Sequence, residues 1–345
     1  MKVGLVGYSG SGKSTVFQWL TGADPDAAKV QQGQMAMADV PDERLDKLGV
    51  HFKPKKGTKY AAIAFLDTPG LMLDERKDNP RRLGILREAN GLLVVLDGYS
   101  ATNLAEQLTR FREELVFADL DILHNRADKL TSQLKRNKPA KEKEVDLAEL
   151  DMVKKVQTAL EAGQSPRDLS LRSEEEKLIR SFQLLTLKPE MVFVNRGDSS
   201  TPLPADLLML APGAIGAPVQ LERELAELDE ESRAAFAAEL GVSGSSRGQT
   251  LRDIFYGMGR VVFFTVGDDE CRAWAIDRDT PAVEAAGAIH TDLSKGFVRA
   301  NVMSYADFLA AGYEEKNCKA NGTLRQESKE YLVKDGDVMH VLANK

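Results

Sequence analysis

Residues 7–15 decide the fold, and their sequence is Gly7-Tyr8-Ser9-Gly10-Ser11-Gly12-Lys13-Ser14-Thr15. The stretch fits the phosphate-loop pattern G-x-x-x-x-G-K-S/T without a gap. An apolar run at residues 3–6 predicts a short buried strand before it, and the amphipathic pattern of residues 14–20 predicts a helix after it. This order lets backbone N–H groups surround a phosphate at the positive end of a helix. The alternative is a glycine-rich turn without a ligand, but the flanking strand and helix favour nucleotide binding.

Individual roles follow from the pattern. Lys13 is predicted to reach the β- and γ-phosphate oxygens, and Ser14 is predicted to offer its hydroxyl to Mg²⁺. A second apolar run at residues 61–66 predicts a strand that ends on Asp67-Thr68-Pro69-Gly70. In such a D-x-x-G element, Asp67 would hold Mg²⁺ through water and the Gly70 N–H would face the γ-phosphate. D-x-x-G is also common in ordinary turns, but its position after a strand favours the functional interpretation.

Composition limits the class of protein. A length of 345 residues predicts two or three domains, and 43% hydrophobic with 29% charged residues is typical of a globular protein. The net charge of −7 restricts any nucleic-acid contact to a local basic patch. The only cysteines are Cys271 and Cys318, which favours a reducing compartment over a disulfide framework. Without a signal-peptide pattern or an apolar run of membrane-spanning length, the sequence predicts a cytoplasmic protein with no membrane contact.

A base-reading element is predicted near residue 195. The apolar run at residues 91–97 predicts a strand covered on both faces, and residues 191–194 predict another. The second run ends in Asn195-Arg196-Gly197-Asp198, which is similar to the N-K-x-D element that reads guanine. The Asp198 carboxylate accepts two hydrogen bonds from guanine, whereas adenine offers an acceptor at the same edge. The alternative is an Asn/Asp cap on a turn.

Two positions weaken the expectation of fast hydrolysis. Residues 22–40 are polar and lie where a GTPase carries its first switch loop, but no threonine occurs between Thr21 and Thr58. An ordinary surface loop fits this stretch equally well. Leu71 follows Gly70, where many GTPases carry the glutamine that orients the attacking water. Leucine has no polar atom for this task.

Residues 105–185 predict an inserted helical hairpin. Apolar residues recur at spacings of three and four along one arm, from Leu108 to Leu134, and along a return arm, from Leu150 to Leu160. Two such arms predict an antiparallel pair packed as a coiled coil. The turn between them is basic, with Lys135, Arg136 and Lys138 near its centre. A solvated tip and an RNA contact are both compatible with this charge.

The last 85 or so residues predict a β-grasp fold. Strands are predicted at residues 261–266 and 272–276, a helix at residues 281–289, and a closing hairpin from residues 331–333 and 338–341. Together with the phosphate loop and its strands, the sequence therefore predicts an α/β protein. Its sheet is mostly parallel and of the P-loop GTPase type, the helical hairpin is inserted into it, and the β-grasp domain follows.

The chain resembles the YchF / Obg-like ATPase family over nearly its whole length. The stretches that carry the resemblance are residues 40–48, 118–121, 183–189, 263–267, 285–292, 295–297 and 335–340. The resemblance implies a P-loop domain formed by residues 1–104 and 186–260, a coiled-coil hairpin over residues 105–185, and a ubiquitin-like TGS domain over residues 261–345. It also implies ribosome association and slow nucleotide hydrolysis, with ATP commonly preferred over GTP. We expect a monomer that binds GTP or ATP with Mg²⁺. Its ribosome or rRNA contacts would be made by Lys135, Arg136, Lys138 and the TGS domain.

Several positions depart from the family pattern. Gly10 stands where the family has asparagine, and the switch threonine has no counterpart. Asp198 stands where the family has glutamate, which is linked to its tolerance of ATP. Leu71, by contrast, agrees with the family's hydrophobic residue at the glutamine position. These departures mark a divergent member.

Three functions fit the sequence. The first is a slow NTPase whose nucleotide state switches its grip on the translation machinery, supported by Lys13, Ser14, Asp67 and Gly70. The second is a nucleotide-binding scaffold that hydrolyses nothing and acts through its hairpin and TGS domain, supported by Leu71 and the missing threonine. A small-molecule kinase is the weakest, because the sequence shows neither an acceptor site nor a lid.

Overall fold

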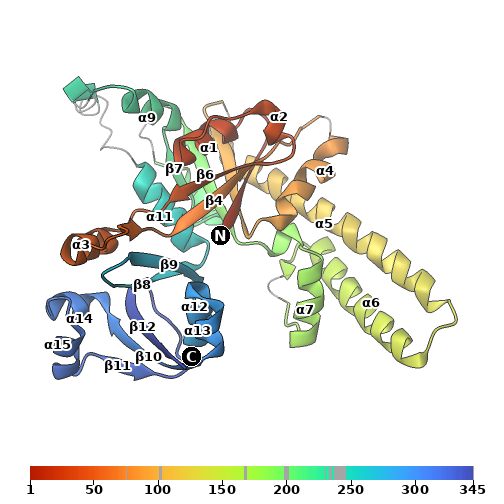
Figure 1. Ribbon diagram of the computed structural model, residues 1–345. Coiled ribbons are helices and arrows are strands. Elements are labelled where there is room, and N and C mark those ends of the chain that lie inside the picture. Colours follow the sequence, from red (N-terminus) through yellow and green to blue (C-terminus); the bar gives the residue numbers. More distant parts are fainter. Residues whose placement is uncertain are drawn as a thin grey trace. The chain divides into compact units, whose positions relative to one another are not determined.

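The computed structural model describes residues 1–74, 76–100, 103–166, 169–197, 202–229, 231–232, 235–236 and 246–344 (Figure 1). It consists of two compact units. The P-loop unit comprises residues 2–36 and 65–244, and the C-terminal unit comprises residue 1 with residues 37–64 and 245–345. Asp198 lies outside the described residues. No helix in the described ranges is long and apolar enough to cross a membrane.

The phosphate loop belongs to a six-stranded sheet with the order β2-β4-β1-β5-β6-β7. Its strands are β1 (Lys2–Val6), β2 (Gln34–Asp39), β4 (Ala62–Asp67), β5 (Gly91–Gly98), β6 (Glu190–Arg196) and β7 (Ile215–Ala217). β1 pairs with β5, β5 with β6 and β6 with β7, all in parallel. The first six residues of β5 are buried, as its unbroken apolar run predicts. The assignment of residues 22–40 to a loop is wrong for residues 34–39, which form β2.

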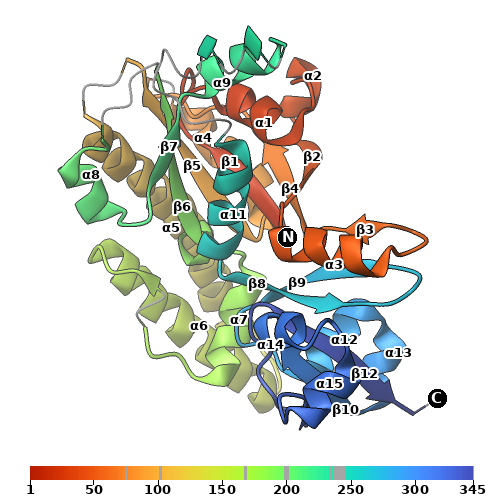
Figure 2. The same cartoon turned by 90° about the vertical axis from the view of Figure 1, so that its left-hand side faces the viewer.

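Helices cover both faces of this sheet in the P-loop unit (Figure 2). Val192 and Val194 pack in the same apolar cluster as Leu108 and Phe111 of α5, whereas the intervening Phe193 lies 5.9 Å from the Trp19 ring of α1. Side chains alternate between the faces of a strand, so α1 and α5 lie on opposite faces. The helices of this unit are α1 (Lys13–Thr21), α2 (Ala27–Val30), α4 (Asn79–Gly84), α5 (Leu104–Leu134), α6 (Ala140–Glu161), α7 (Ser173–Ser181), α8 (Ala205–Leu210) and α9 (Val219–Ala226), with short 3₁₀ turns at Arg76–Asp78, Ile85–Glu88 and Leu185–Leu187.

The predicted helical hairpin is confirmed by α5 and α6, which run side by side (Figure 1). Their facing residues share one apolar cluster with α7. Arg126 of α5 adds two bonds of 2.7 Å to the Glu149 carboxylate of α6. At the base of the hairpin, the fully buried Asp119 accepts a hydrogen bond of 2.8 Å from Arg87 and two from Thr186. These bonds fix the base of the hairpin to the rest of the P-loop unit.

The C-terminal unit contains a second six-stranded sheet, with the order β11-β10-β12-β8-β9-β3. Its strands are β3 (Thr58–Lys59), β8 (Arg260–Thr265), β9 (Cys271–Asp277), β10 (Phe297–Ser304), β11 (Arg325–Glu327) and β12 (Asp337–Ala343), and its helices are α3 (Glu43–Phe52), α11 (Arg247–Gly257), α12 (Ala282–Ile289), α13 (Thr291–Lys295), α14 (Tyr305–Ala310) and α15 (Glu315–Ala320).

The β-grasp prediction is confirmed, but the predicted closing hairpin is wrong. β12 pairs antiparallel with β10, which the sequence pattern did not reveal, and in parallel with β8. Residues 331–333 form no strand; Leu332 makes only an isolated bridge to Pro281. β3 comes from the N-terminal part of the chain and pairs in parallel with β9. The three predicted domain boundaries remain a prediction.

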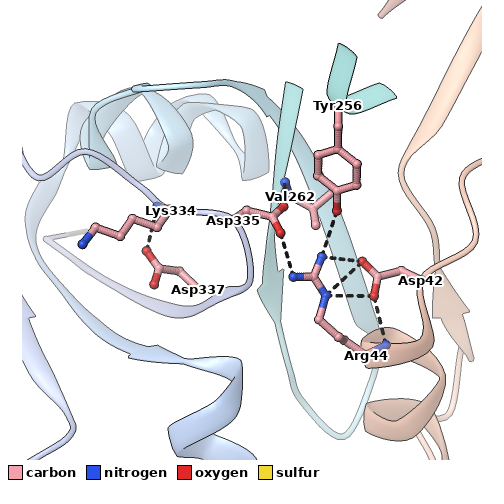
Figure 3. Close-up of polar contacts among 7 residues, drawn as sticks. All are labelled: Asp42, Arg44, Tyr256, Val262, Lys334, Asp335 and Asp337. Carbon is pink, nitrogen blue, oxygen red and sulfur yellow. Dashed lines mark hydrogen bonds and ion pairs between the residues drawn. The ribbon is translucent and has the colours of Figure 1, made fainter. Parts of the chain in front are cut away.

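Arg44 joins α3 to the β-grasp part of the C-terminal unit (Figure 3). Its guanidinium donates hydrogen bonds to both carboxylate oxygens of Asp42. It also donates to Oδ2 of Asp335 at 2.7 Å and to the Tyr256 hydroxyl oxygen at 3.0 Å. It also lies 5.1 Å above the ring of Phe264. Asp335 is held in turn, because its other oxygen accepts the Val262 N–H at 3.0 Å. One side chain therefore links three elements of this unit.

Replacing Arg44 by alanine is expected to lower the free energy of unfolding of the C-terminal unit by about 1–3 kcal/mol, because it leaves two partly buried carboxylates without their cation. Trp274 lies in β9 and reports this unit in a Trp19→Phe background. Denaturant unfolding followed by its fluorescence gives the measurement. Lys47→Ala, at an exposed site on the same helix, is the matched control. Equal midpoints for the two variants would contradict the structural role of Arg44.

Candidate functional site

The phosphate loop connects β1 to α1, and Gly12 occupies its most crowded position. Gly12 has φ +82°, a region that residues with a side chain rarely adopt. A Cβ built on it would stand 2.0 Å from Nδ2 of Asn195. Asn195, at the end of β6, is buried and donates from Nδ2 to the Ser11 carbonyl oxygen at 3.2 Å. The predicted base-reading and phosphate-binding elements are therefore in direct contact.

Lys13, the first residue of α1, is only 6% exposed. Its Nζ donates to the Tyr8 carbonyl oxygen at 2.9 Å, across the loop. Burial lowers the pKa of the Lys13 ammonium to about 8; the nearby Asp67 carboxylate opposes this shift and Arg82 adds to it. A buried ammonium group with a depressed pKa gains a strong electrostatic interaction when an anion arrives.

Ser14 and Asp67 meet beside Lys13. The Ser14 hydroxyl donates to Oδ2 of Asp67 at 2.7 Å, and Asp67 is fully buried at the end of β4. Burial raises the pKa of the Asp67 carboxyl, against the effects of the Ser14 bond and the Lys13 charge. Its Oδ1 has no hydrogen-bond partner among the described residues. Two adjacent oxygen donors, one with its lone pairs unused, fit a hard cation such as Mg²⁺.

The D-x-x-G loop pairs with the phosphate loop through the backbone. Ser9 N–H donates to the Leu71 carbonyl oxygen at 2.8 Å, and Leu71 N–H donates to the Gly7 carbonyl oxygen at 3.0 Å. A Cβ on Gly70 would stand 2.6 Å from the Ser9 Cα and 2.9 Å from the Lys13 Nζ. Gly70 therefore allows a close approach that any side chain would prevent. The two phosphate-binding elements predicted from the sequence lie together.

The side chain of Leu71 is buried, with 1% of its surface exposed. It packs in the apolar cluster that includes Val6, Leu83 and Leu92. It therefore points into the core of the P-loop unit. A hydrophobic residue fits this position, because a polar side chain buried in apolar surroundings without a hydrogen bond would cost free energy.

The other residues that the sequence predicts for nucleotide or RNA binding differ in their burial and in their hydrogen-bond partners. Ser11 is buried with an unpartnered Oγ, and Asn195 has an unpartnered Oδ1, in both cases with respect to the described residues. Arg196 is half-buried at the end of β6. At the hairpin tip, Lys138 forms a 2.7 Å ion pair with Asp146, whereas Lys135 and Arg136 belong to the turn between α5 and α6.

Sequence reasoning missed two residues that border the site. Arg82, on α4, donates from Nη1 to the Gly70 carbonyl oxygen. Asn79, one turn earlier, is fully buried and bonds both backbone groups of Met72 at 3.0 and 2.9 Å. No spacing rule connects these residues to D-x-x-G. The only signal was Pro80, which commonly opens a helix and stands at the start of α4.

A phosphate loop at the end of β1, an acidic residue at the end of the adjacent β4 and a mostly parallel sheet define a P-loop nucleotide-binding protein. Residues 2–126 match the family described as "50S ribosome-binding GTPase", and residues 261–344 match a C-terminal YchF GTPase family described as a "protein of unknown function". The chain belongs to the YchF / Obg-like ATPase family.

Several relatives match over most of their length. "Ribosome-binding ATPase YchF" of Bacillus subtilis is 30% identical, covering 100% of this chain and 99% of the relative. The Escherichia coli O157:H7 protein of the same name is 33% identical, with 99% of each chain covered. "Obg-like ATPase 1" of Oryza sativa subsp. japonica is 30% identical, over 98% of this chain and 91% of the relative. The solved YchF GTPase of Schizosaccharomyces pombe has a TM-score of 0.78 at 26% identity, covering 99% and 97% of the two chains.

Proposed function

We propose that this protein is a slow nucleotide-dependent switch that binds ATP or GTP with Mg²⁺ and associates with the ribosome in the cytoplasm. The proposal rests on the meeting of Lys13, Ser14 and Asp67, which places a buried ammonium group beside two oxygen-bearing side chains. One oxygen of this group, Oδ1 of Asp67, has no hydrogen-bond partner among the described residues. The names of the relatives, which describe ribosome-binding ATPases, support the choice of partner.

Each residue has a proposed role. Phosphate binding is assigned to Ser9, Gly10, Ser11, Gly12, Lys13, Ser14, Thr15 and Gly70, base binding to Asn195, Arg196 and Asp198, and Mg²⁺ binding to Ser14 and Asp67. When bound, Mg²⁺ neutralises charge on the phosphate oxygens. Asn195 holds the Ser11 carbonyl, so it fixes the shape of the loop before any nucleotide arrives. When a nucleotide binds, the Lys13 Nζ gives up its hydrogen bond to the Tyr8 carbonyl oxygen and donates to phosphate oxygens instead.

Slow hydrolysis follows from Leu71. Phosphoryl transfer in this class requires a group that positions the attacking water. The Leu71 side chain is apolar and packed in the core, so it takes no part in this task. The alternative, a scaffold that binds nucleotide without hydrolysing it, is favoured by the same observation. The turnover rate decides between the two.

Single-turnover hydrolysis of bound ATP and GTP tests the proposal. We expect the isolated protein to turn over far below the ~1–1000 per second of typical enzymes. We also expect ribosomes to accelerate it. Fast turnover without ribosomes would contradict the role assigned to Leu71. Complete absence of hydrolysis, with ribosomes present and nucleotide bound, would select the scaffold function.

The ribosome contact is proposed for the hairpin tip and the TGS domain. Of the three basic tip residues, Lys138 is already paired with Asp146 at 2.7 Å. Replacing Lys135 and Arg136 by alanine is therefore expected to flatten the salt dependence of ribosome co-sedimentation by about one slope unit per lost phosphate contact. Adding Lys138→Ala to this double variant is expected to change the salt dependence by less than about one further slope unit, because Lys138 is already paired with Asp146.

The matched control for the tip is Lys129→Ala with Lys154→Ala, two exposed lysines on the arms of the same hairpin. This pair removes the same net charge away from the tip. If both double variants shift co-sedimentation equally across a salt series, the effect comes from net charge, and the tip is an ordinary solvated turn.

A further inference from the structure

Two cationic side chains meet at Gly70. Arg82 donates from Nη1 to the Gly70 carbonyl oxygen. Lys13 approaches the same residue, because a Cβ built on Gly70 would stand 2.9 Å from the Lys13 Nζ. The predicted γ-phosphate position is therefore bordered by two positive groups instead of one.

Buried neighbours fix the position of Arg82. Asn79 lies three residues before it on α4 and is fully buried. Its side-chain amide accepts the Met72 N–H at 3.0 Å and donates to the Met72 carbonyl at 2.9 Å. Leu83, the residue after Arg82, is fully buried in the same apolar cluster as Leu71. α4 is thus tied directly to the D-x-x-G loop, and Arg82 is placed there before any ligand binds.

The chemistry of the guanidinium suits a phosphate. Arginine has five N–H donors in a fork that matches phosphate oxygens. One of these groups holds Gly70, and the others have no protein acceptor within the described part of the chain. Two neighbouring cations repel each other, and an anion between them removes that cost. The arrangement favours an anion that carries several oxygens.

We propose that Arg82 binds the terminal phosphate of the nucleoside triphosphate and thereby distinguishes triphosphate from diphosphate. The inference rests on the proposed function, because it places the γ-phosphate beside Gly70 and Lys13. Beyond that function, the guanidinium of Arg82 on α4 acts as a second cation beside Lys13. Loss of the γ-phosphate leaves Arg82 bonded to the Gly70 carbonyl alone, so the D-x-x-G loop and α4 together respond to the nucleotide state.

Calorimetric titration with ATP, ADP, GTP and GDP in Mg²⁺ tests the proposal, using wild type, Arg82→Ala, Arg82→Gln and Arg81→Ala. Glutamine keeps a donor for the Gly70 carbonyl but removes the charge, which separates phosphate binding from loop support. Arg81 is the adjacent, exposed arginine of the same helix and serves as the matched control. We expect both Arg82 variants to bind the triphosphates about 10- to 100-fold more weakly, with diphosphate affinity changed by less than about two-fold.

The outcomes separate this inference from the proposed function. Equal losses for tri- and diphosphates in both Arg82 variants, or no loss in either, overturn the role of Arg82 while wild-type binding upholds the proposed function. A loss of the same size in Arg81→Ala also overturns it, because general charge then accounts for the effect. If wild type binds none of the four nucleotides, the proposed function and this inference fail together.

Discussion

Replacing Lys13 by alanine is expected to weaken ATP and GTP binding by at least about 100-fold, or roughly 3 kcal/mol. The side chain is 6% exposed, so its bonds to phosphate form in a desolvated site where charge-assisted bonds are strongest. The affinity for diphosphates is expected to fall less than that for triphosphates, because diphosphates lack the γ-phosphate that Lys13 also reaches. Titration calorimetry of the nucleotide-free protein measures both losses.

Loss of binding in this variant is not expected to come from unfolding. Burial lowers the pKa of Lys13, which means that the folded protein holds this charge at a cost. Alanine removes that cost, so the variant is expected to unfold at no lower denaturant concentration than wild type. Lys177→Ala, an exposed lysine on α7, is the control for general charge. Wild-type affinity in Lys13→Ala would remove Lys13 from the nucleotide site.

Replacing Leu71 by glutamine is expected to lower the free energy of unfolding of the P-loop unit by about 2–4 kcal/mol and to leave hydrolysis slow. The side chain lies in an apolar cluster with 1% exposure, so a glutamine there buries an amide without a partner. It does not reach a water beside the γ-phosphate. Trp19 lies in α1 and reports this unit in a Trp274→Phe background.

Leu71→Met is the matched control, because it keeps an apolar side chain of similar volume. It is expected to cost less than about 1.5 kcal/mol. A glutamine variant that is as stable as the methionine variant and hydrolyses nucleotide faster than wild type would show that residue 71 faces the site. Slow hydrolysis would then follow from the side chain at 71 alone.

The elements that carry chemistry were predictable because short backbone motifs specify them. The phosphate loop needs Gly12 next to Asn195, and the D-x-x-G loop needs Gly70 against Ser9. Such close approaches restrict the residue type strongly, so the sequence records them. The parallel sheet was equally visible, since strands buried on both faces form unbroken apolar runs such as residues 91–96.

The parts that sequence missed depend on partners far away in the chain. β10 mixes buried Ala300 and Val302 with exposed Val298 and Arg299, so its alternation is weak. β3 has two residues, and only its pairing with β9 defines it. The sequence of residues 37–64 alone therefore could not predict that this strand belongs to the C-terminal unit. Arg82 was missed for a similar reason: its contact with Gly70 depends on how α4 is anchored by Asn79.

The most direct test of the account is calorimetric titration of the nucleotide-free protein with ATP and GTP, in Mg²⁺ and again with Mg²⁺ removed by chelation. We expect one binding site for a purine nucleoside triphosphate. Binding at this site is expected to weaken when Mg²⁺ is absent, because the Asp67 and Ser14 oxygens then have no cation to share with the phosphates. Failure of both nucleotides to bind in Mg²⁺ would contradict the account.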